Sequence, residues 1–349
     1  MSNIEDFDYS VDTMQTDAAG DQKETTYQNA KWSQQLGYYK KIPELQKAIQ
    51  ALAIWTVGKG YTADARTQVI LDNIRGWGED TFNSIMTNML VAKKIGGDAF
   101  CEIIRNPNTG TLINMKPLDP GSIVVVVDEK GMIKRYEQNS KIQGTKPKKF
   151  RKQDILHIVN ERIADEIHGT SVIDACEWVI LARNEAMADW KKVLHRNVVP
   201  VRIIEVDSDN LTKIAKLKAQ YEDVINKGEV IIVPKGTVEI KDTNPVLQDS
   251  LSTIKYYENF FYQAVGIPKI ILGGSEEFTE ASSKIGYLTF EQIYAREQKE
   301  LEADLWSQMA IKIKFKAPAS LQNELLSDQK KDETQGVSQP NDTIAGRGE

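Results

Sequence analysis

The sequence has few of the side chains that build metal sites and disulfide frameworks. Its 349 residues include two cysteines, Cys101 and Cys176, and three histidines, His157, His168 and His195. Two isolated thiols provide no disulfide framework, and neither the thiols nor the imidazoles follow the spacing of a zinc site. We therefore expect a reducing compartment, no metal and no cofactor.

The sequence also lacks a long apolar run and an excess of positive charge. No run reaches membrane-spanning length, and the N-terminus lacks the basic-then-apolar pattern of a signal peptide. We expect a protein that is made and remains in the cytoplasm, without membrane contact. The net charge of -6 argues against a protein that binds nucleic acid over its whole surface. With 41% hydrophobic residues, the composition is that of a globular protein of one to three domains.

Nucleotide-binding and hydrolase motifs are incomplete. Gly58-Lys59-Gly60 lacks the upstream glycine and the following hydroxyl of a phosphate-binding loop. His157, together with Asp119 or Asp154 and Ser171, has the composition of a hydrolase triad, but there is no Gly-x-Ser-x-Gly elbow. We favour a structural role for His157. A hydrolase stays as an alternative, which predicts turnover that is lost in His157→Ala with folding intact.

The first half of the chain changes from helical to strand periodicity. Residues 1–30 are acidic and polar with little to bury, so we expect them to be disordered. Pro43 opens a predicted helix that ends near Gly58, and a second helix spans about residues 80–95. Alternating or continuously apolar segments then predict antiparallel strands, at residues 99–105, 111–116, 122–127, 132–138 and 153–158.

The second half is dominated by long helices. One helix, capped by Thr170 or Ser171, ends before Pro200. A later helix starts near Leu247 and stops at Gly266-Ile267-Pro268. Between these helices lies a small insert, with predicted strands at 201–206, 229–233 and 237–241 and a predicted helix at 211–227.

A loop rich in glycine, serine and glutamate precedes the longest predicted helix. The periodicity of this helix persists to Met309, and at 1.5 Å per residue it is about 40 Å long. A mobile loop held between rigid helices suits a gate or a sliding contact better than a catalytic pocket. Residues 311–316 then alternate strictly and predict a strand with Lys312, Lys314 and Lys316 on one face. Such a face is more often solvated than bound to DNA.

Several short motifs occur in order along roughly Ile42 to Phe315. They are Gly97-Asp98-Ala99-Phe100, Leu118-Asp119-Pro120, Arg135-Tyr136, Asp154-Ile155-Leu156-His157, His168-Gly169-Thr170-Ser171, Pro200, Val233-Pro234-Lys235-Gly236, Val265-Gly266-Ile267-Pro268 and Leu272-Gly273. Each motif is weak alone. In this order and spacing they resemble the portal proteins of tailed double-stranded DNA bacteriophages.

The resemblance implies an α+β portal-type fold with a β-rich wing, a two-helix stem, a small α/β clip, a tunnel loop and a long crown helix. The implied parts are a disordered acidic arm at 1–30, a wing at 31–167, a first stem helix at 168–199, a clip at 200–246, a second stem helix at 247–266, a tunnel loop at 267–281, a long helix with a wing-return strand and small crown at 282–326, and a flexible tail at 327–349.

The resemblance also implies the biological role. Such proteins form a ring, usually a dodecamer, at a unique capsid vertex, which is the conduit for double-stranded DNA during packaging and ejection. Implied partners are the terminase large subunit, a head-tail adaptor protein, and the major capsid protein or scaffold. The chain would be no enzyme, since ATP hydrolysis would belong to the terminase. It would be assembled in the host cytoplasm and reside in the virion. A non-viral structural or adaptor protein with a helical stalk is the alternative.

The tunnel loop and the stem carry the predicted DNA-facing residues. Carboxylates around a channel would repel DNA phosphates and keep the duplex centred, and a ring repeats each charge once per copy. Lysines near the stem base, Lys191 and Lys192, could supply a compensating basic ring. Solvated surface charges are the plain alternative. The predicted loop residues are Lys269, Ser275, Glu276, Glu277, Thr279, Glu280, Ser282 and Lys284.

The insert at 200–246 is the predicted docking surface for partner proteins. Its strands could also pair between neighbouring copies and so close the ring. The predicted docking residues are Arg202, Glu205, Asp207, Lys213, Lys216, Glu222, Lys227 and Lys235.

Overall fold

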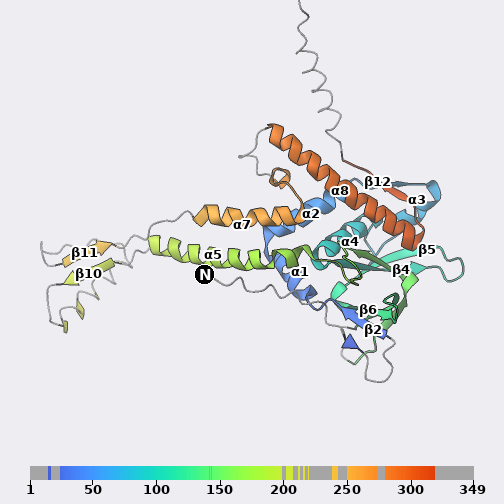
Figure 1. Cartoon of the computed structure of the whole chain (residues 1–349), viewed down its shortest axis with the longest axis horizontal. Coiled ribbons are helices and arrows are strands. Elements are labelled where there is room, and N and C mark those ends of the chain that lie inside the picture. Colours follow the sequence, from blue (N-terminus) through green and yellow to red (C-terminus); the bar gives the residue numbers. More distant parts are fainter. Residues whose placement is uncertain are drawn as a thin grey trace, which may run out of the picture. The chain divides into compact units, whose positions relative to one another are not determined.

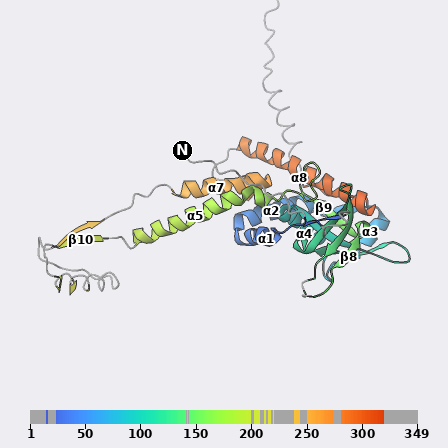
Figure 2. The ribbon, with the colours of Figure 1, turned by 60° about the horizontal axis from the view of Figure 1, so that its bottom comes forward.

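The computed structural model describes residues 15–16, 24–140, 142, 144–198, 202–206, 211–212, 215–216, 219, 238–242, 250–272 and 280–318. The chain divides into two compact units. The first, here called the body, comprises residues 1–178 and 258–349, and the second comprises residues 179–257. Figures 1 and 2 show the helices and strands of both units.

Four helices lie in the first hundred residues of the body, and local sequence signals set several of their ends. Pro43 occupies the first turn of its helix, the Asp64 carboxylate accepts from the Thr67 amide, and Thr81 forms a capping box with Ser84. The four helices are α1 Trp32–Lys41, α2 Pro43–Val57, α3 Ala65–Asp72 and α4 Phe82–Gly96. The predicted helices at 43–57 and 80–95 are confirmed.

The predicted antiparallel hairpins are confirmed, but they belong to two different sheets. A three-stranded sheet has the order β5-β4-β9, with β4 Asp98–Arg105, β5 Leu112–Leu118 and β9 Ile155–Val159. A five-stranded sheet has the order β1-β2-β6-β7-β8, with β1 Gln15–Thr16, β2 Glu24–Gln28, β6 Ile123–Asp128, β7 Ile133–Gln138 and β8 Lys148–Arg151. Short 3-10 turns at Pro120–Ser122 (η1) and Lys152–Asp154 (η2) connect them.

The expected disorder of residues 1–30 is wrong for the stretch from Glu24 to Gln28. This stretch is strand β2, which pairs along its whole length with β6. The Glu24 carboxylate also forms ion pairs with Lys134 (2.5 Å) and Arg135 (2.7 Å) of β7. The partners of this strand come from about a hundred residues later in the chain, so the polar composition of the arm does not reveal them.

The main core of the body is built from segments far apart in the sequence. Leu301, Leu305 and Met309 of α8 (Glu280–Met309) are buried with side chains of α2, α4 and the three-stranded sheet. The predicted strand after this helix is confirmed as β12, Ile313–Phe315, and it pairs with β3, Tyr61–Ala63. Figure 1 shows α8 and β12 beside the early helices of the chain. The C-terminal segments therefore complete the hydrophobic core of the N-terminal ones.

Two helices cross the boundary between the units. They are α5, Val172–Val198, and α7, Ser250–Val265, as the helical periodicity predicts. In the second unit, β10 (Arg202–Val206) pairs antiparallel with β11 (Val238–Asp242). The strand predicted at 229–233 and the tail from 327 lie outside the described residues. No helix in the described part of the chain is long and apolar enough to cross a bilayer.

Candidate functional site

The entry to the predicted tunnel loop is a tightly built helix terminus. At the end of α7, Gly266 has a φ of 76° and its amide donates to the Gln263 carbonyl at 3.1 Å. The next amide, of Ile267, donates to the Tyr262 carbonyl at 2.9 Å. These two bonds form a Schellman motif, which explains why the helix stops where the glycine predicts. A β-carbon on Gly266 would lie 3.0 Å from the side chain of Ile293, so the glycine also lets α8 pass close to the turn.

The exit of the loop packs against its entry. A 3-10 turn, η3 (Lys269–Leu272), follows Pro268. A β-carbon on Gly286 of α8 would be in ordinary van der Waals contact with Pro268, at 3.6 Å. Trp55 of α2 makes edge contacts with two aromatic rings of α8, those of Tyr287 and Phe290. The two described ends of the loop are thus held together on the body.

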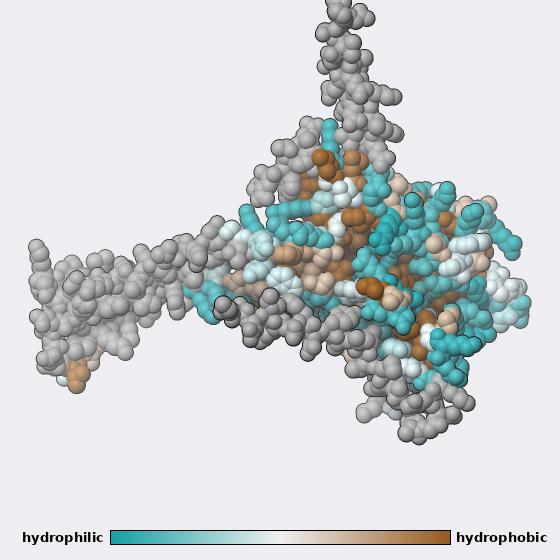
Figure 3. Space-filling view, viewed as in Figure 1, coloured by the Kyte–Doolittle hydropathy of each residue, from teal (hydrophilic) through white to brown (hydrophobic). Residues whose placement is uncertain are grey.

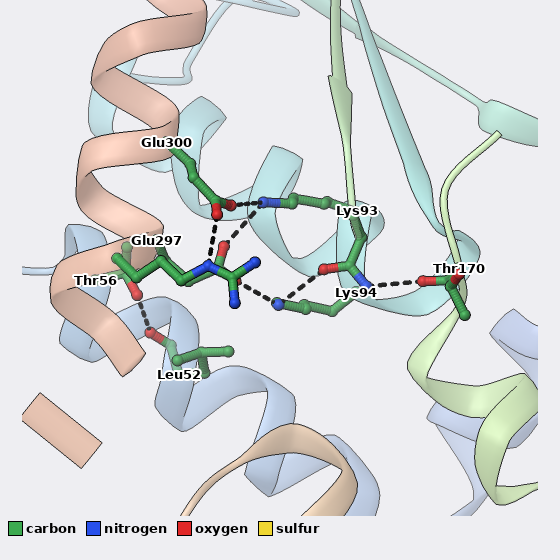
Figure 4. A network of polar contacts seen from close by, with 9 residues as sticks. Leu52, Thr56, Lys93, Lys94, Thr170, Glu297 and Glu300 are labelled. Atoms are coloured by element: carbon green, nitrogen blue, oxygen red, sulfur yellow. Dashed lines mark hydrogen bonds and ion pairs between the residues drawn. The ribbon is translucent and has the colours of Figure 1, made fainter. Parts of the chain in front are cut away.

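Farther along α8, a buried network of charges fixes the helix to α4 (Figure 4). The ammonium of Lys93 contacts Glu297 at 2.9 Å and Glu300 at 3.2 Å. The neighbouring Lys94 contacts the other oxygen of Glu297 at 2.5 Å and donates to Asn160 at 2.9 Å. Lys93 is 1% exposed and Glu297 is 5% exposed, so this is an internal tie and not a surface ion pair.

The buried carboxylate and ammonium groups of this tie form ion pairs with one another. Burial alone would raise the pKa of the Glu297 carboxyl, but the ammonium groups of Lys94 and Lys93 outweigh burial and hold the pKa below its usual range. Beside them, the Gln298 amide donates to the Thr56 carbonyl at 2.8 Å, which joins α8 to α2. Removing Glu297 would leave two buried ammonium groups without their shared carboxylate.

A second buried polar cluster lies where α4 runs into β4. The Asp98 carboxylate contacts the Nε2 atom of His157 at 2.8 Å and the Nδ1 atom of His168. The other ring nitrogen of His157 lies 3.2 Å from the Tyr136 hydroxyl, and Phe100 stacks on the imidazole. Burial would raise the pKa of Asp98, yet the hydrogen bonds with the two histidines outweigh burial and hold the pKa below its usual range.

The hydrolase alternative does not match this geometry. The carboxylate beside His157 is Asp98, and not Asp119 or Asp154. The Ser171 hydroxyl donates to the Ile95 carbonyl and accepts from the first amides of α5, so it caps that helix as predicted. Since both imidazole nitrogens of His157 are already bonded to other groups, the structure does not assemble the predicted serine, histidine and aspartate as a triad.

Three of the short sequence motifs meet at this junction. Gly97 ends α4 with a φ of 84°, and a β-carbon there would lie 2.0 Å from the carbonyl oxygen of Gly169. The amide of Asn160 donates to the Gly97 carbonyl at 2.8 Å, and Thr170 donates to the Asn160 carbonyl at 2.8 Å. The Gly-Asp, Asp-Ile-Leu-His and His-Gly-Thr-Ser motifs therefore meet at one place, and two glycines permit the close approach of their backbones.

The predicted residues of the stem and insert are placed only in part. Lys191 and Lys192 lie on α5 and are exposed, and Lys192 contacts Asp189 at 2.9 Å. Lys216 is exposed, while Arg202 and Glu205 belong to β10. The other predicted docking residues lie outside the described part of the chain: Asp207, Lys213, Glu222, Lys227 and Lys235.

Some of the predicted loop residues lie within the described part of the chain and others lie outside it. Lys269 lies in η3, Lys284 lies in α8, and both are half-buried. Glu280 and Ser282 belong to the first turn of α8. The remaining ones lie outside the described residues: Ser275, Glu276, Glu277 and Thr279. Within the described residues, no group of three or more histidine, cysteine or acidic side chains is arranged to hold a metal ion.

The amino-acid sequence does not reveal the lysine-glutamate tie. Lys93 and Lys94 stand in the last turn of a helix whose other face is apolar, and cations at that position usually remain in solvent. One sequence feature could have indicated that these lysines are buried. They stand just before Gly96-Gly97, where the chain continues into a buried strand. Glu297 carried no such signal, because its partners lie more than two hundred residues away.

Comparison with solved structures shows the fold. The chain is similar to the neck of a native gene transfer agent particle computed with C12 symmetry, with 16% identity, a TM-score of 0.67, and coverage of 90% of this chain and 92% of that chain. It is also similar to the HK97 family phage portal protein from Corynebacterium diphtheriae, with 12% identity, a TM-score of 0.55, and coverage of 84% and 96%. No curated protein sequence matches the chain.

A protein-family model also matches the chain, and this match identifies its family. The family model described as the portal protein of Mu bacteriophage matches residues 39–302, which is most of the chain and includes both buried polar clusters and the ends of the predicted tunnel loop. The α+β fold and the family expected from the ordered motifs are thereby confirmed. The chain belongs to the phage portal protein family represented by that of Mu bacteriophage.

Proposed function

We propose that copies of this chain form a ring, dodecameric by the family resemblance, at one vertex of a phage capsid. Duplex DNA would pass through the ring during packaging and ejection. The observation that carries the proposal is the family match over residues 39–302. The similarity to a neck computed with C12 symmetry supports it, because that match covers nine-tenths of both chains.

In this function the predicted tunnel loop would face the DNA. Carboxylates from Glu276, Glu277 and Glu280 would repel phosphates, so the duplex could slide without being held. The described supports suit such a loop, since the Schellman turn at Gly266 fixes its entry and the buried tie at Glu297 fixes the helix after it.

The segment at 200–246 would be the docking site for the terminase large subunit and, later, for a head-tail adaptor protein. The paired strands β10 and β11 give this segment a folded frame. Deletion of residues 208–228 should abolish terminase docking and leave the body folded. Unchanged docking in that variant would refute the assignment of this segment.

Electron microscopy of the purified full chain tests the proposal directly. End-on class averages should show closed rings with a central hole wide enough for duplex DNA. A homogeneous monomer or dimer, also in the presence of capsid protein or scaffold, would contradict the ring and favour an adaptor with a helical stalk.

Charge reversal tests the role of the loop. The double variant Glu276→Lys and Glu277→Lys should impair packaging or ejection, because a basic ring would hold the phosphates that the wild-type ring repels. A matched control is Glu79→Lys with Glu129→Lys, which makes the same change of charge at two exposed positions of the body. Unchanged DNA length and infectivity in the loop variant would refute the role of these carboxylates.

A further inference from the structure

The strand after α8 presents a row of exposed lysines. In β12, Ile313 and Phe315 are buried in the core, at 4% and 7% exposure. Lys312, Lys314 and Lys316 alternate with them and are exposed. Because side chains two residues apart in a strand lie on one face, about 6.6 Å from each other, the three ammonium groups form an extended row. Figure 3 shows a largely hydrophilic surface where Figure 1 places β12 and α3.

This row, here called the lysine face, differs from other basic strands of the body. Lys134 pairs with Glu24 at 2.5 Å, and on β8 Lys148 pairs with Glu102 at 2.7 Å. The three lysines in and beside β12 form no ion pair within the described part of the chain. In a protein of net charge -6, an unneutralised row of cations is a local exception.

Carboxylates also lie next to the lysine face, and two of them accept hydrogen bonds from backbone amides. Glu302 of α8 accepts from the Phe315 amide at 2.8 Å, and Asp64 accepts from the Thr67 amide at 3.1 Å. A further cation adjoins the row, because Lys59 is exposed and its neighbour Gly60 accepts from the Lys316 amide at 2.9 Å. Lys59 therefore extends the row of exposed cations, beside the carboxylates of Glu302 and Asp64.

We infer that the lysine face binds the phosphate backbone of duplex DNA. The row is extended and exposed, which suits a polyanion and not a small ligand that needs a pocket. Lysine acts on phosphates as a point charge, and each phosphate that it neutralises releases a condensed counterion. This inference rests on the proposed function, which supplies DNA as the partner. It gives the body a DNA-retaining surface that is separate from the tunnel loop, whose carboxylates repel phosphates.

The test measures DNA affinity against salt concentration, with the full chain and a fluorescent duplex in an anisotropy titration. The variant Lys312→Gln, Lys314→Gln and Lys316→Gln should weaken binding and reduce the slope of log K against log salt by about 2.7, or about 0.9 for each phosphate that is no longer neutralised. The matched control is Lys148→Gln, Lys149→Gln and Lys152→Gln, which removes the same charge from β8 and the adjoining turn and should leave the slope near that of wild type.

Each outcome decides the inference. A wild-type chain that does not bind the duplex, an unchanged slope in the β12 variant, or equal changes in both triple variants would overturn it. Electron microscopy of the same samples separates this failure from failure of the proposed function. Rings with an unchanged slope refute only the lysine face, and absence of wild-type rings refutes the proposed function. Loss of rings in the β12 variant with an unchanged slope would identify the face as a protein contact, which also overturns the inference.

Discussion

Two groups of lysines border α8, and their surroundings give them opposite characters. Lys93 and Lys94 of α4 are buried and share the Glu297 carboxylate, so they hold α8 to the body. The lysines of the lysine face, in and beside β12, are exposed and lack an ion-pair partner within the described residues. The same side chain is an internal tie in one place and an available cation in the other. The difference shows that burial and partners, and not residue type, decide what a lysine does here.

The two halves of α8 show a related contrast. From Phe290 to Met309 the helix is anchored by buried side chains and by the lysine-glutamate tie. Before Phe290 it is less covered, and Ile285 is 66% exposed. Figure 3 shows hydrophobic residues at the surface around this first part of the helix. The half next to the predicted tunnel loop is thus less firmly fixed than the half in the core.

The largest effect should come from breaking the internal tie. Glu297→Ala leaves Lys93 and Lys94 without their shared counter-charge in the core, so we expect a loss of about 3–5 kcal/mol in the free energy of unfolding. Chemical denaturation measures it. Glu300→Ala is the control, because this carboxylate is 37% exposed and should cost about 1 kcal/mol or less. Equal losses in the two variants would contradict the contrast between buried and exposed partners.

Two glycines with similar positive φ angles give a second comparison between a buried, crowded position and an open one. Gly97→Ala places a β-carbon 2.0 Å from the Gly169 carbonyl and should cost about 3 kcal/mol or more. At Gly131 the φ is 74° and a β-carbon would meet no atom within 4 Å, so Gly131→Ala should cost only about 1–2 kcal/mol. Thermal unfolding of both variants separates the cost of the steric contact from the cost of the positive φ angle. Similar losses of stability in the two variants would exclude a role for the contact with Gly169.

The Asp98 cluster should make stability depend on pH on the acid side. The folded-state pKa of Asp98 lies below its usual value. Its contribution is therefore complete above the unfolded-state pKa of about 3.9 and is lost as the pH falls through the lower folded-state value. Asp98→Asn should cost about 2 kcal/mol at neutral pH and flatten the loss of stability below about pH 4. A variant with the wild-type acid profile would show that other carboxyl groups dominate.

The smallest effect should come from an exposed ion pair. Lys192 contacts Asp189 at 2.9 Å, but the two side chains are 71% and 64% exposed. Lys192→Gln should therefore change the free energy of unfolding by about 0.5 kcal/mol or less. Denaturant titration at low and high salt checks this value, and a loss as large as that of Glu297→Ala would show that exposure does not separate the two kinds of lysine.

Much of the secondary structure could be predicted because it rests on local signals. The stop of α7 at Gly266, the start of α2 at Pro43 and the hairpins of the two sheets follow from glycine, proline and alternation. The helices α1 and α3 and the strand β2 were not predicted. For β2 the reason is its pairing with β6, which comes about a hundred residues later in the chain.

Among the site residues, those that depend on a local pattern could be predicted, and those that depend on distant partners could not. Ser171 as a helix cap and the lysine face of β12 could be predicted, since each depends on a pattern of a few residues. The pairing of Asp98 with His157 and His168 could not, because the sequence offered Asp119 and Asp154 as nearer candidates. The charges of the tunnel loop and the docking residues of the insert stay predictions.

The sequence by itself determined the bounds of the long helices and of the hairpin strands, and the order of motifs that places the chain among portal proteins. These features depend on neighbouring residues, through capping, turn geometry and periodicity. The tertiary structure alone decided which charges are buried. Lys93 finds Glu297 across more than two hundred residues, and only chain folding brings both out of water together. A charge buried with its partner becomes a structural tie, and one left in solvent stays free for a ligand.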